Sequence, residues 1–362
     1  MCALSPGTTR VRQILRAAKS VILSAANRSG VLDAVRDSRW RQNRLLILCY
    51  HGVSLEDEHE WNPKLYMSPS KFESRLDALS RGDYTVLPLA EALAALNESR
   101  LPPRSVALTF DDGLFDFYVN VFPALKARGF PATVYLTTYY CEYNRPIFGL
   151  VCSYILWKAR HTGPLNIRPL TGEDRSFSLA TGDGRESAVR AIADAAEREH
   201  LSAREKDEVA ARLAEHIGVD YAELRAKRIL HLMNTEEVTE LADKGVDFQL
   251  HTHRHRNANE PDSLSREIRD NRLRIERLTN RRALHFCYPS GLYDRALLPC
   301  LENEEVASAT TCDPGLVTSR TSRLLLPRFV DTQLVSAEKF EGWLSGAAAF
   351  LPGRRSYGQA GG

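Results

Sequence analysis

Short apolar runs alternate with amphipathic segments along most of this 362-residue chain, and this alternation is the feature that most constrains its fold. Residues 44–50 (RLLILCY) form a continuous apolar run, typical of a strand buried on both faces. Ser68-Pro69 then opens a helical pattern that Gly82 ends. The same patterns predict further strands at 84–87, 106–110, 133–137, 246–250, 285–288, 306–311 and 324–330, and further helices at 90–97, 115–128, 264–278 and 295–304.

Strands that alternate with single helices are typical of βαβ units and a parallel sheet. About eight such strands, each followed by one helix, favour a barrel over an open sheet. We therefore predict an α/β fold, a (β/α)7–8 barrel, over residues 44–335.

Residues 142–232 interrupt the alternation. Two charged helical patterns lie within them, at 186–199 and 202–217. We expect this segment to be a helical insertion or lid on the barrel. A helical arm over 1–43 is expected before the barrel, and a C-terminal helix with a flexible tail over 336–362 after it.

The total charge of +2 conceals an uneven distribution. Residues 1–46 hold nine basic and two acidic side chains, a surplus of seven, so the rest of the chain carries −5. A near-neutral total excludes a general polyanion binder, and no nucleic-acid partner is expected. Residues 10–36 place apolar positions at helical spacing with basic residues between them, which indicates an amphipathic helix. That helix either packs on the barrel or contacts a membrane surface.

The seven cysteines include no C-x-x-C pair. Cys49 and Cys287 lie in apolar strand patterns, where free cysteine behaves as a small hydrophobe. No run approaches the roughly 18 apolar residues of a membrane helix, and no export signal is visible. We expect a reduced cytoplasmic protein, either free or peripheral at the inner face of the membrane. The oligomeric state is not indicated.

Two adjacent carboxylates, Asp111 and Asp112, follow the strand predicted at 106–110, within the sequence TFDDG. Functional side chains of a parallel barrel project from the loops after its strands. Neighbouring carboxylates repel each other unless a proton or a cation lies between them. The pair therefore indicates a functional site, although an isolated pair of this kind is also common as a helix cap.

Three of the ten histidines, His251, His253 and His255, follow the strand predicted at 246–250. Imidazole nitrogen and carboxylate oxygen suit a borderline divalent cation, and three protein ligands with one water are the pattern of catalytic zinc. His251 and His255 are four residues apart, so a helical turn or a compact loop can bring them together. The cluster predicts a metal site, whereas a lone histidine would more often be structural.

Two further strand ends carry weaker signals. Tyr288-Pro289-Ser290-Gly291 follows the strand predicted at 285–288 and is typical of a tight loop. His51 follows the first strand and is either functional or a core or capping histidine.

Together these residues resemble the polysaccharide deacetylases, the NodB-homology domain of carbohydrate esterase family four. The resemblance rests on TFDDG at 109–113, the His-Thr-x-x-His sequence at 251–255 and the Tyr-Pro-x-Gly loop at 288–291. It covers about 45–335, with 142–232 poorly matched. It implies the barrel-like deacetylase fold of that family with a helical insertion.

The resemblance also implies roles for individual residues. Asp111 would be the general base, and Asp112, His251 and His255 would hold a divalent metal, usually zinc. The backbone N–H of Tyr288 would stabilise the oxyanion. Three residues of these motifs have no such role: His253 is expected beside the metal ligands or at the rim of the substrate site, and Pro289 and Ser290 at the substrate.

The chain departs from the usual family pattern at two points. The late Leu-x-x-His, whose histidine protonates the leaving amine, is not visible after Tyr288. The order is similar to the permuted exopolysaccharide deacetylases, which implies His51 as the general acid. Arg328 is expected either to hold Asp111 in place or to form a salt bridge at the rim of the barrel.

The expected function is therefore metal-dependent hydrolysis of N-acetyl groups on a sugar or polysaccharide, with release of acetate. An activated water would attack the carbonyl while Asp111 takes its proton. The expected partner is an N-acetylated glycan or a lipid-linked or nucleotide-linked precursor. Two alternatives remain open: the same site acting on another amide or ester, and a catalytically silent carbohydrate-binding or membrane-surface scaffold.

Overall fold

The computed structural model describes residues 21–26, 28–257 and 260–351. Eight strands form one sheet in the order β11-β10-β9-β6-β5-β1-β12, with β4 paired to the start of β5, and every pairing in it is parallel. The α/β fold with a curled parallel sheet is confirmed. The strands are β1 (Leu46–Tyr50), β4 (Thr85–Val86), β5 (Ser105–Asp112), β6 (Thr133–Leu136), β9 (Asp247–Leu250), β10 (His285–Cys287), β11 (Ser308–Thr310) and β12 (Phe329–Val330).

The sheet curls because the segment 323–330 connects its two ends. Leu326 forms an isolated parallel bridge with Thr310 of β11, and Phe329 of β12 pairs with Leu48 of β1. The strand predicted over 324–330 is thus divided between two neighbours, and only Phe329–Val330 is a strand in the sheet. This segment brings Arg328 into the interior of the barrel, where its side chain is fully buried.

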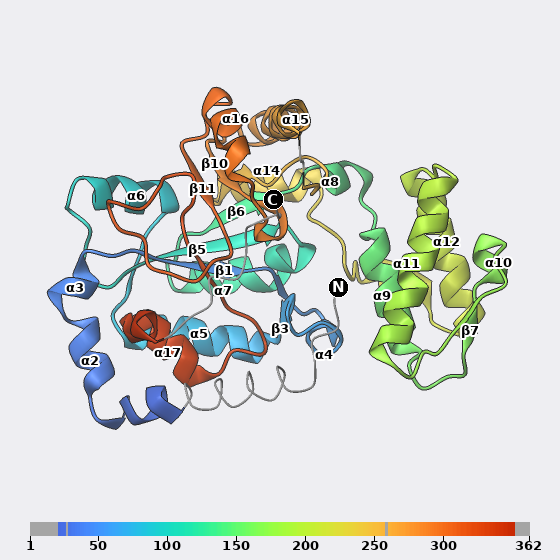
Figure 1. The fold of residues 1–362 in the computed structure, drawn as a ribbon, viewed down its shortest axis with the longest axis horizontal. Coiled ribbons are helices and arrows are strands. Elements are labelled where there is room, and N and C mark those ends of the chain that lie inside the picture. The colour runs from blue at the N-terminus through green and yellow to red at the C-terminus, as the bar shows by residue number, and fades with distance from the viewer. Residues whose placement is uncertain (1–20, 27, 258–259, 352–362) are drawn as a thin grey trace.

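Helices surround the sheet (Figure 1). Ser68 caps the first long one by accepting a hydrogen bond from the Lys71 N–H, and Gly82 ends it, as predicted. The helices around the barrel are α5 (Pro69–Arg81), α6 (Leu89–Asn97), α7 (Phe122–Ala127), α8 (Tyr139–Tyr143), α14 (Thr235–Asp243), α15 (Pro261–Thr279), α16 (Leu298–Asn303) and α17 (Ala337–Ser345).

A group of helices between α8 and α14 projects to one side of the barrel (Figure 1). The two charged helices predicted there are present, as α11 (Gly182–Arg198) and α12 (Ala203–Ile217). Ser202 and Glu205 form a reciprocal capping box at the start of α12. The group also contains α9 (Phe148–Lys158), α10 (Arg168–Thr171), α13 (Tyr221–Ala226) and the antiparallel pair β7 (Leu165–Asn166) and β8 (Ser176–Phe177).

The helix predicted over 115–128 is wrong in detail. A π-helical turn (Phe117–Val121) precedes α7, and Pro123 lies in the first turn of α7. Proline has no N–H and its ring clashes with the carbonyl four residues earlier, which favours a widened turn at this point. The helix predicted over 295–304 is likewise divided into a 3-10 turn (Arg295–Leu297) and α16.

Three short elements near the site were not predicted. Strands β2 (Gly52–Val53) and β3 (Tyr66–Met67) form a separate parallel pair, and α4 (Glu58–Trp61) lies between them. Each is too short to carry a periodic pattern in the sequence.

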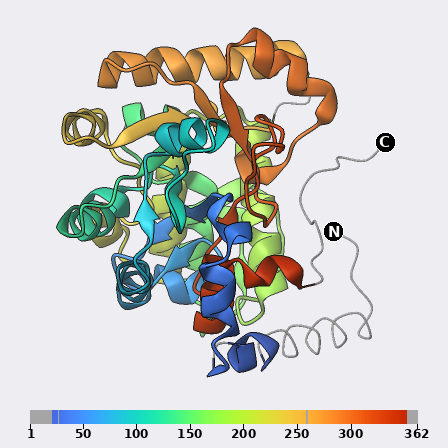
Figure 2. The same cartoon turned by 90° about the vertical axis from the view of Figure 1, so that its left-hand side faces the viewer.

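The predicted helix over 10–36 lies partly outside the described residues, which begin at 21. Residues 21–26 are helical, but α2 (Val31–Arg36) is separate, because Gly30 adopts a left-handed backbone with φ 76°. Leu23 packs against Gly342 of α17, so this part of the arm contacts the barrel domain (Figure 2). A third short helix, α3 (Arg39–Gln42), leads into β1.

The predicted flexible tail lies outside the described residues from 352 onward, whereas the C-terminal helix is present as α17. In the part of the chain that the structure describes, no helix is both long and apolar enough to span a membrane.

Candidate active site

Strand β5 delivers two carboxylates to the carboxyl end of the sheet. Asp111 is buried, whereas Asp112 is partly accessible and turns away in a left-handed conformation with φ 72°. Gly113 continues the turn at φ 82°, and a Cβ at this position would lie 2.3 Å from the Leu136 side chain. Only glycine therefore fits at position 113. The turn directs Asp111 towards Arg328 and Asp112 towards His251 and His255.

Arg328 holds Asp111 through two parallel hydrogen bonds, Nη1 to Oδ1 and Nη2 to Oδ2, each 2.7 Å long. Its Nε–H donates to the Thr311 carbonyl at 3.0 Å, which fixes the guanidinium. Burial alone would raise the pKa of Asp111, but the charge and hydrogen bonds of Arg328 outweigh it and hold the pKa well below its usual range. Arg328 thus holds Asp111, and the alternative of a salt bridge at the barrel rim is excluded by its complete burial.

Asp112, His251 and His255 come together at the same end of the sheet. Asp112 Oδ1 lies 3.3 Å from His251 Nε2 and 3.2 Å from His255 Nε2. Ligand atoms about 2.0–2.1 Å from a tetrahedral zinc ion are about 3.3 Å apart. The donor types and the spacing both fit a divalent cation.

The orientation of His251 leaves Nε2 available as a ligand. Its Nδ1 lies 2.9 Å from the Cys287 carbonyl, so Nδ1 carries the proton and Nε2 the lone pair. Its backbone N–H donates to Asn271 Oδ1 at 2.9 Å, and the Asn271 amide donates to the Leu136 carbonyl at 3.0 Å. Asn271 of α15 thus connects the histidine loop to β6, a role that the sequence pattern does not reveal.

Among the residues that the structure describes, two other groups have metal-binding geometry. Cys49, His51 and Asp111 form one, and Asp111, His251 and Cys287 form the other; within each, the possible ligand atoms lie within 4.8 Å of one another. Both depend on Asp111, whose two oxygens already accept hydrogen bonds from Arg328. The group around Asp112 is therefore the better metal site.

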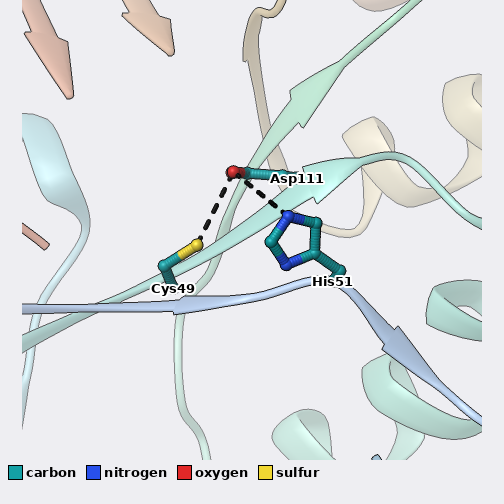
Figure 3. A group of neighbouring side chains, drawn as sticks. All are labelled: Cys49, His51 and Asp111. Carbon is teal, nitrogen blue, oxygen red and sulfur yellow. Dashed lines mark hydrogen bonds and ion pairs between the residues drawn. The ribbon is translucent and has the colours of Figure 1, made fainter. Parts of the chain in front are cut away.

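His51 faces Asp111 from the end of β1. Its Nε2 lies 3.8 Å from Asp111 Oδ2, and the side chain is 20% exposed, so it can exchange protons with solvent. Figure 3 shows His51 and Cys49 both directed at the same Asp111 oxygen, with Cys49 Sγ at 3.6 Å. The structure therefore brings the predicted general acid beside the predicted base.

Three cysteine thiols surround the Asp111–Arg328 pair. Cys287 Sγ lies 3.4 Å from Asp111 Oδ2, and Arg328 Nη2 lies 3.0 Å from Cys287 Sγ and 3.7 Å from Cys312 Sγ. A hydrogen bond from Cys49 and the charge of Arg328 lower the pKa of Cys312 to about 6 despite its burial. The apolar pattern around Cys49 predicts a small hydrophobe, but Cys49 lies two residues before His51 and so on the same face of the strand.

Several site predictions need correction. The backbone N–H of Tyr288 donates to the Thr310 carbonyl at 3.2 Å, as part of the sheet, and so is not the free oxyanion donor that was expected. Of the two positions expected for His253, the rim of the substrate site is excluded, because the side chain is only 2% exposed and its Nδ1 lies 2.9 Å from Thr138 Oγ1. Pro289 is also buried, so of the four predicted substrate and oxyanion positions only Ser290 is exposed.

Comparison with known proteins relates this chain to deacetylases. The family model described as polysaccharide deacetylase matches residues 98–178 and 209–307. A poly-β-1,6-N-acetyl-D-glucosamine N-deacetylase of Staphylococcus aureus (strain N315) is 30% identical over 118 residues, which is 29% of this chain and 40% of that protein. The chain spans 32% to 40% of the length of the curated relatives it matches.

Solved structures share the fold. The Streptococcus pyogenes deacetylase PplD, in complex with acetate, superposes with a TM-score of 0.53 at 21% identity, covering 82% of this chain and 96% of PplD. A polysaccharide deacetylase from Bacillus cereus gives a TM-score of 0.51 at 18% identity, and the match covers 83% of this chain and 69% of the Bacillus cereus protein. Since the family model matches residues 98–178 and 209–307, parts of the insertion included, and the motif residues Asp112, His251 and His255 meet at one end of the curled sheet, this chain belongs to the polysaccharide deacetylase family.

Proposed function

We propose that this protein is a metal-dependent hydrolase that removes N-acetyl groups from a polymer of N-acetylated amino sugars. One observation carries the proposal: a carboxylate with two imidazoles at metal-ligand spacing lies beside a second carboxylate held by a buried arginine. The S. aureus relatives named as poly-β-1,6-N-acetyl-D-glucosamine N-deacetylases support this substrate class.

Asp112, His251 and His255 would hold the cation, and we propose zinc because two imidazoles and one carboxylate are common zinc ligands. When bound, such a cation supplies Lewis-acid polarisation of a carbonyl and lowers the pKa of a nearby water. Asn271 and the Cys287 carbonyl keep His251 in the orientation that this requires.

Asp111 is the proposed general base. The two hydrogen bonds from Arg328 fix its carboxylate plane, so the oxygen that faces the site is always presented in the same direction. It takes a proton from the attacking water, and the carbonyl carbon of the acetamide gains the oxygen.

His51 is the proposed general acid. Loss of the sugar nitrogen requires a proton, and a partly exposed imidazole at the end of β1 can deliver one. The C–N bond then breaks, giving acetate and a free amine. Asp111 and His51 lie close enough to act on one bound acetamide.

Acetate release from N-acetylglucosamine oligomers tests this function. We expect Asp111→Asn to lower the rate by about 10²- to 10⁴-fold while the zinc content stays the same. Asp183→Asn, an exposed substitution in the first turn of α11, is the matched control and should leave the rate unchanged. Unchanged acetate release in Asp111→Asn would remove the base from the mechanism. Release from acetylated small esters but not from the oligomers would favour another acyl substrate.

We further propose that the N-terminal arm contacts the inner face of a membrane. Val21, Ile22 and Val31 expose apolar side chains at 66%, 52% and 48%, within a stretch of sequence, residues 1–46, that carries nine basic residues and two acidic ones. Apolar and basic side chains together favour anionic lipid surfaces. Co-sedimentation with phosphatidylglycerol vesicles, lost on replacing Val21 and Ile22 with Ser, is the expected result; equal sedimentation with neutral vesicles would contradict it.

A further inference from the structure

A cavity of about 360 Å³ lies between the barrel and the projecting helices, outside the metal site. Its walls come from α8, from α9, α11 and α12, and from the loop that carries His255. The volume is at the lower end of the range for small-molecule sites. Three tyrosines, four cations and two carboxylates are among the residues that line it.

This cavity shares a wall with the metal site. Tyr139 lines the cavity, and its N–H donates to the His253 carbonyl at 2.9 Å. Arg254 and Arg256 also line it, and they flank the proposed metal ligand His255 in the chain. A sugar unit in the cavity would therefore be a near neighbour of a unit whose acetamide lies at the metal site.

Two of the four cations in the cavity are already neutralised. Lys206 Nζ lies 2.6 Å from Glu197 Oε1, and Arg254 Nη1 lies 2.7 Å from Glu267 Oε1. These ion pairs leave little charge for a ligand.

The other two cations are held less closely by carboxylates. Arg145 approaches Asp207 only to 3.6 Å, and Asp207 also accepts a hydrogen bond from the Tyr221 hydroxyl at 2.5 Å. Arg256 is exposed and has no carboxylate within ion-pair distance among the residues described. The cavity thus offers two guanidinium groups, and its lining holds four cations against two carboxylates.

Tyr139 and Tyr140 add aromatic surface beside these arginines. Their rings are perpendicular, with an interplanar angle of 87° and centroids 5.2 Å apart, and both are half-buried. The C–H face of a pyranose packs against an aromatic ring, while the hydroxyl groups of tyrosine hydrogen-bond to sugar hydroxyls. Arginine binds carboxylate and phosphate through two parallel hydrogen bonds.

We propose that this cavity is a subsite for a negatively charged sugar unit next to the unit that is deacetylated. Tyr139 and Tyr140 contact its ring, and Arg145 and Arg256 bind its anionic group. The inference rests on the proposed deacetylase function and narrows its substrate to an anionic saccharide. The anionic group is either a uronate carboxylate or the phosphate of a sugar phosphate or pyrophosphate, which share the same recognition chemistry.

Kinetics on three substrates test the proposal with the zinc-loaded protein. They are a neutral N-acetylglucosamine oligomer, an oligomer of equal length in which glucuronate neighbours the N-acetylated unit, and an oligomer of equal length in which a phosphorylated sugar neighbours it. We expect kcat/KM for one of the two anionic substrates to exceed that for the neutral oligomer at least about 10-fold, mainly through KM. Which anionic substrate is preferred distinguishes carboxylate from phosphate.

Arg256→Gln should reduce this preference about 10-fold, and Arg145→Gln should reduce it independently. Arg190→Gln is the matched control, because Arg190 is an exposed arginine of α11 that lies outside the cavity lining. A preference that is the same in all three variants, or equal kcat/KM for neutral and anionic substrates in the unsubstituted protein, overturns the proposal.

Calorimetric binding of the same three saccharides to Asp111→Asn separates this inference from the proposed function. Tighter binding of an anionic saccharide, lost in the double variant with Arg256→Gln, supports the subsite even if no substrate releases acetate. Acetate release from the neutral oligomer together with equal binding of all three saccharides overturns the subsite and leaves the deacetylase function intact.

Discussion

Arg328 and Asp111 form a two-pronged ion pair inside the barrel, although 217 residues separate them in the chain. Both side chains are almost fully buried, so neither charge can be solvated if the other is removed. The pair fixes the proposed base, and it also ties the last segment of the barrel to β5.

Replacing Arg328 with Met should therefore impair stability and activity together. Loss of one partner of a buried ion pair costs about 3–5 kcal/mol of unfolding free energy, because a buried charge is left unpaired. We expect this loss in urea unfolding at pH 7, with acetate release falling in parallel. Arg204→Met is the control, since Arg204 forms an exposed pair with Glu208 in α12; similar losses in both variants would contradict the account.

Asn271→Ala should weaken zinc binding without removing a ligand. Asn271 accepts a hydrogen bond from the His251 N–H and donates to Leu136 and Thr138, so its loss frees the histidine loop. Removing a group that orients a metal ligand typically costs about 10- to 100-fold in affinity. Competition with a zinc chelator measures this change, and an unaltered dissociation constant would show that Asn271 does not position His251.

His51→Gln should affect amide substrates far more than activated esters. A general acid matters when the leaving group needs a proton, as an amine does, and matters little for a phenolate. We expect acetate release from N-acetylglucosamine oligomers to fall about 10²-fold or more, while hydrolysis of an aryl acetate by the zinc-loaded protein changes much less. Equal losses on both substrates would assign His51 another role.

His231 should make the protein sensitive to acid. Burial, together with Arg228 and Arg225, lowers the pKa of His231 to about 4 in the folded state, against an ordinary value of 6.5. Below pH 6.5 the unfolded chain binds a proton that the folded chain does not, so stability falls as the pH drops from about 7 towards 4. Between pH 7 and pH 5, protonation of His231 in the unfolded chain lowers the free energy of unfolding by about 2 kcal/mol.

Urea unfolding at these two pH values, in the unsubstituted protein and in His231→Asn, isolates this effect. Between pH 7 and pH 5, the free energy of unfolding should fall by about 2 kcal/mol less in the variant than in the unsubstituted protein. The same pH dependence in both proteins would show that His231 is not responsible.

Much of the site could be predicted because parallel strands bring their carboxyl ends to one edge of the sheet. Asp111, Asp112, His251, His255 and His51 each follow a strand with a clear apolar pattern, and the structure brings all five together. Their assembly follows from local sequence and the fold class alone.

Other features depend on contacts that no local pattern encodes. The Tyr288 N–H donates to the Thr310 carbonyl because β10 pairs with β11. His253 is buried in contact with Thr138. Arg328 could be proposed but not assigned, because its contact with Asp111 arises only when the segment 323–330 joins the two ends of the sheet. The cavity beside the insertion likewise requires the tertiary packing of the insertion.

The central claim is that Asp112, His251 and His255 hold a metal required for deacetylation. Acetate release from an N-acetylglucosamine oligomer, measured before chelation, after chelation and after zinc is restored, tests it most directly. We predict activity that disappears on chelation, returns with zinc, and does not return in His255→Gln. Undiminished acetate release from protein shown to be free of metal would contradict it.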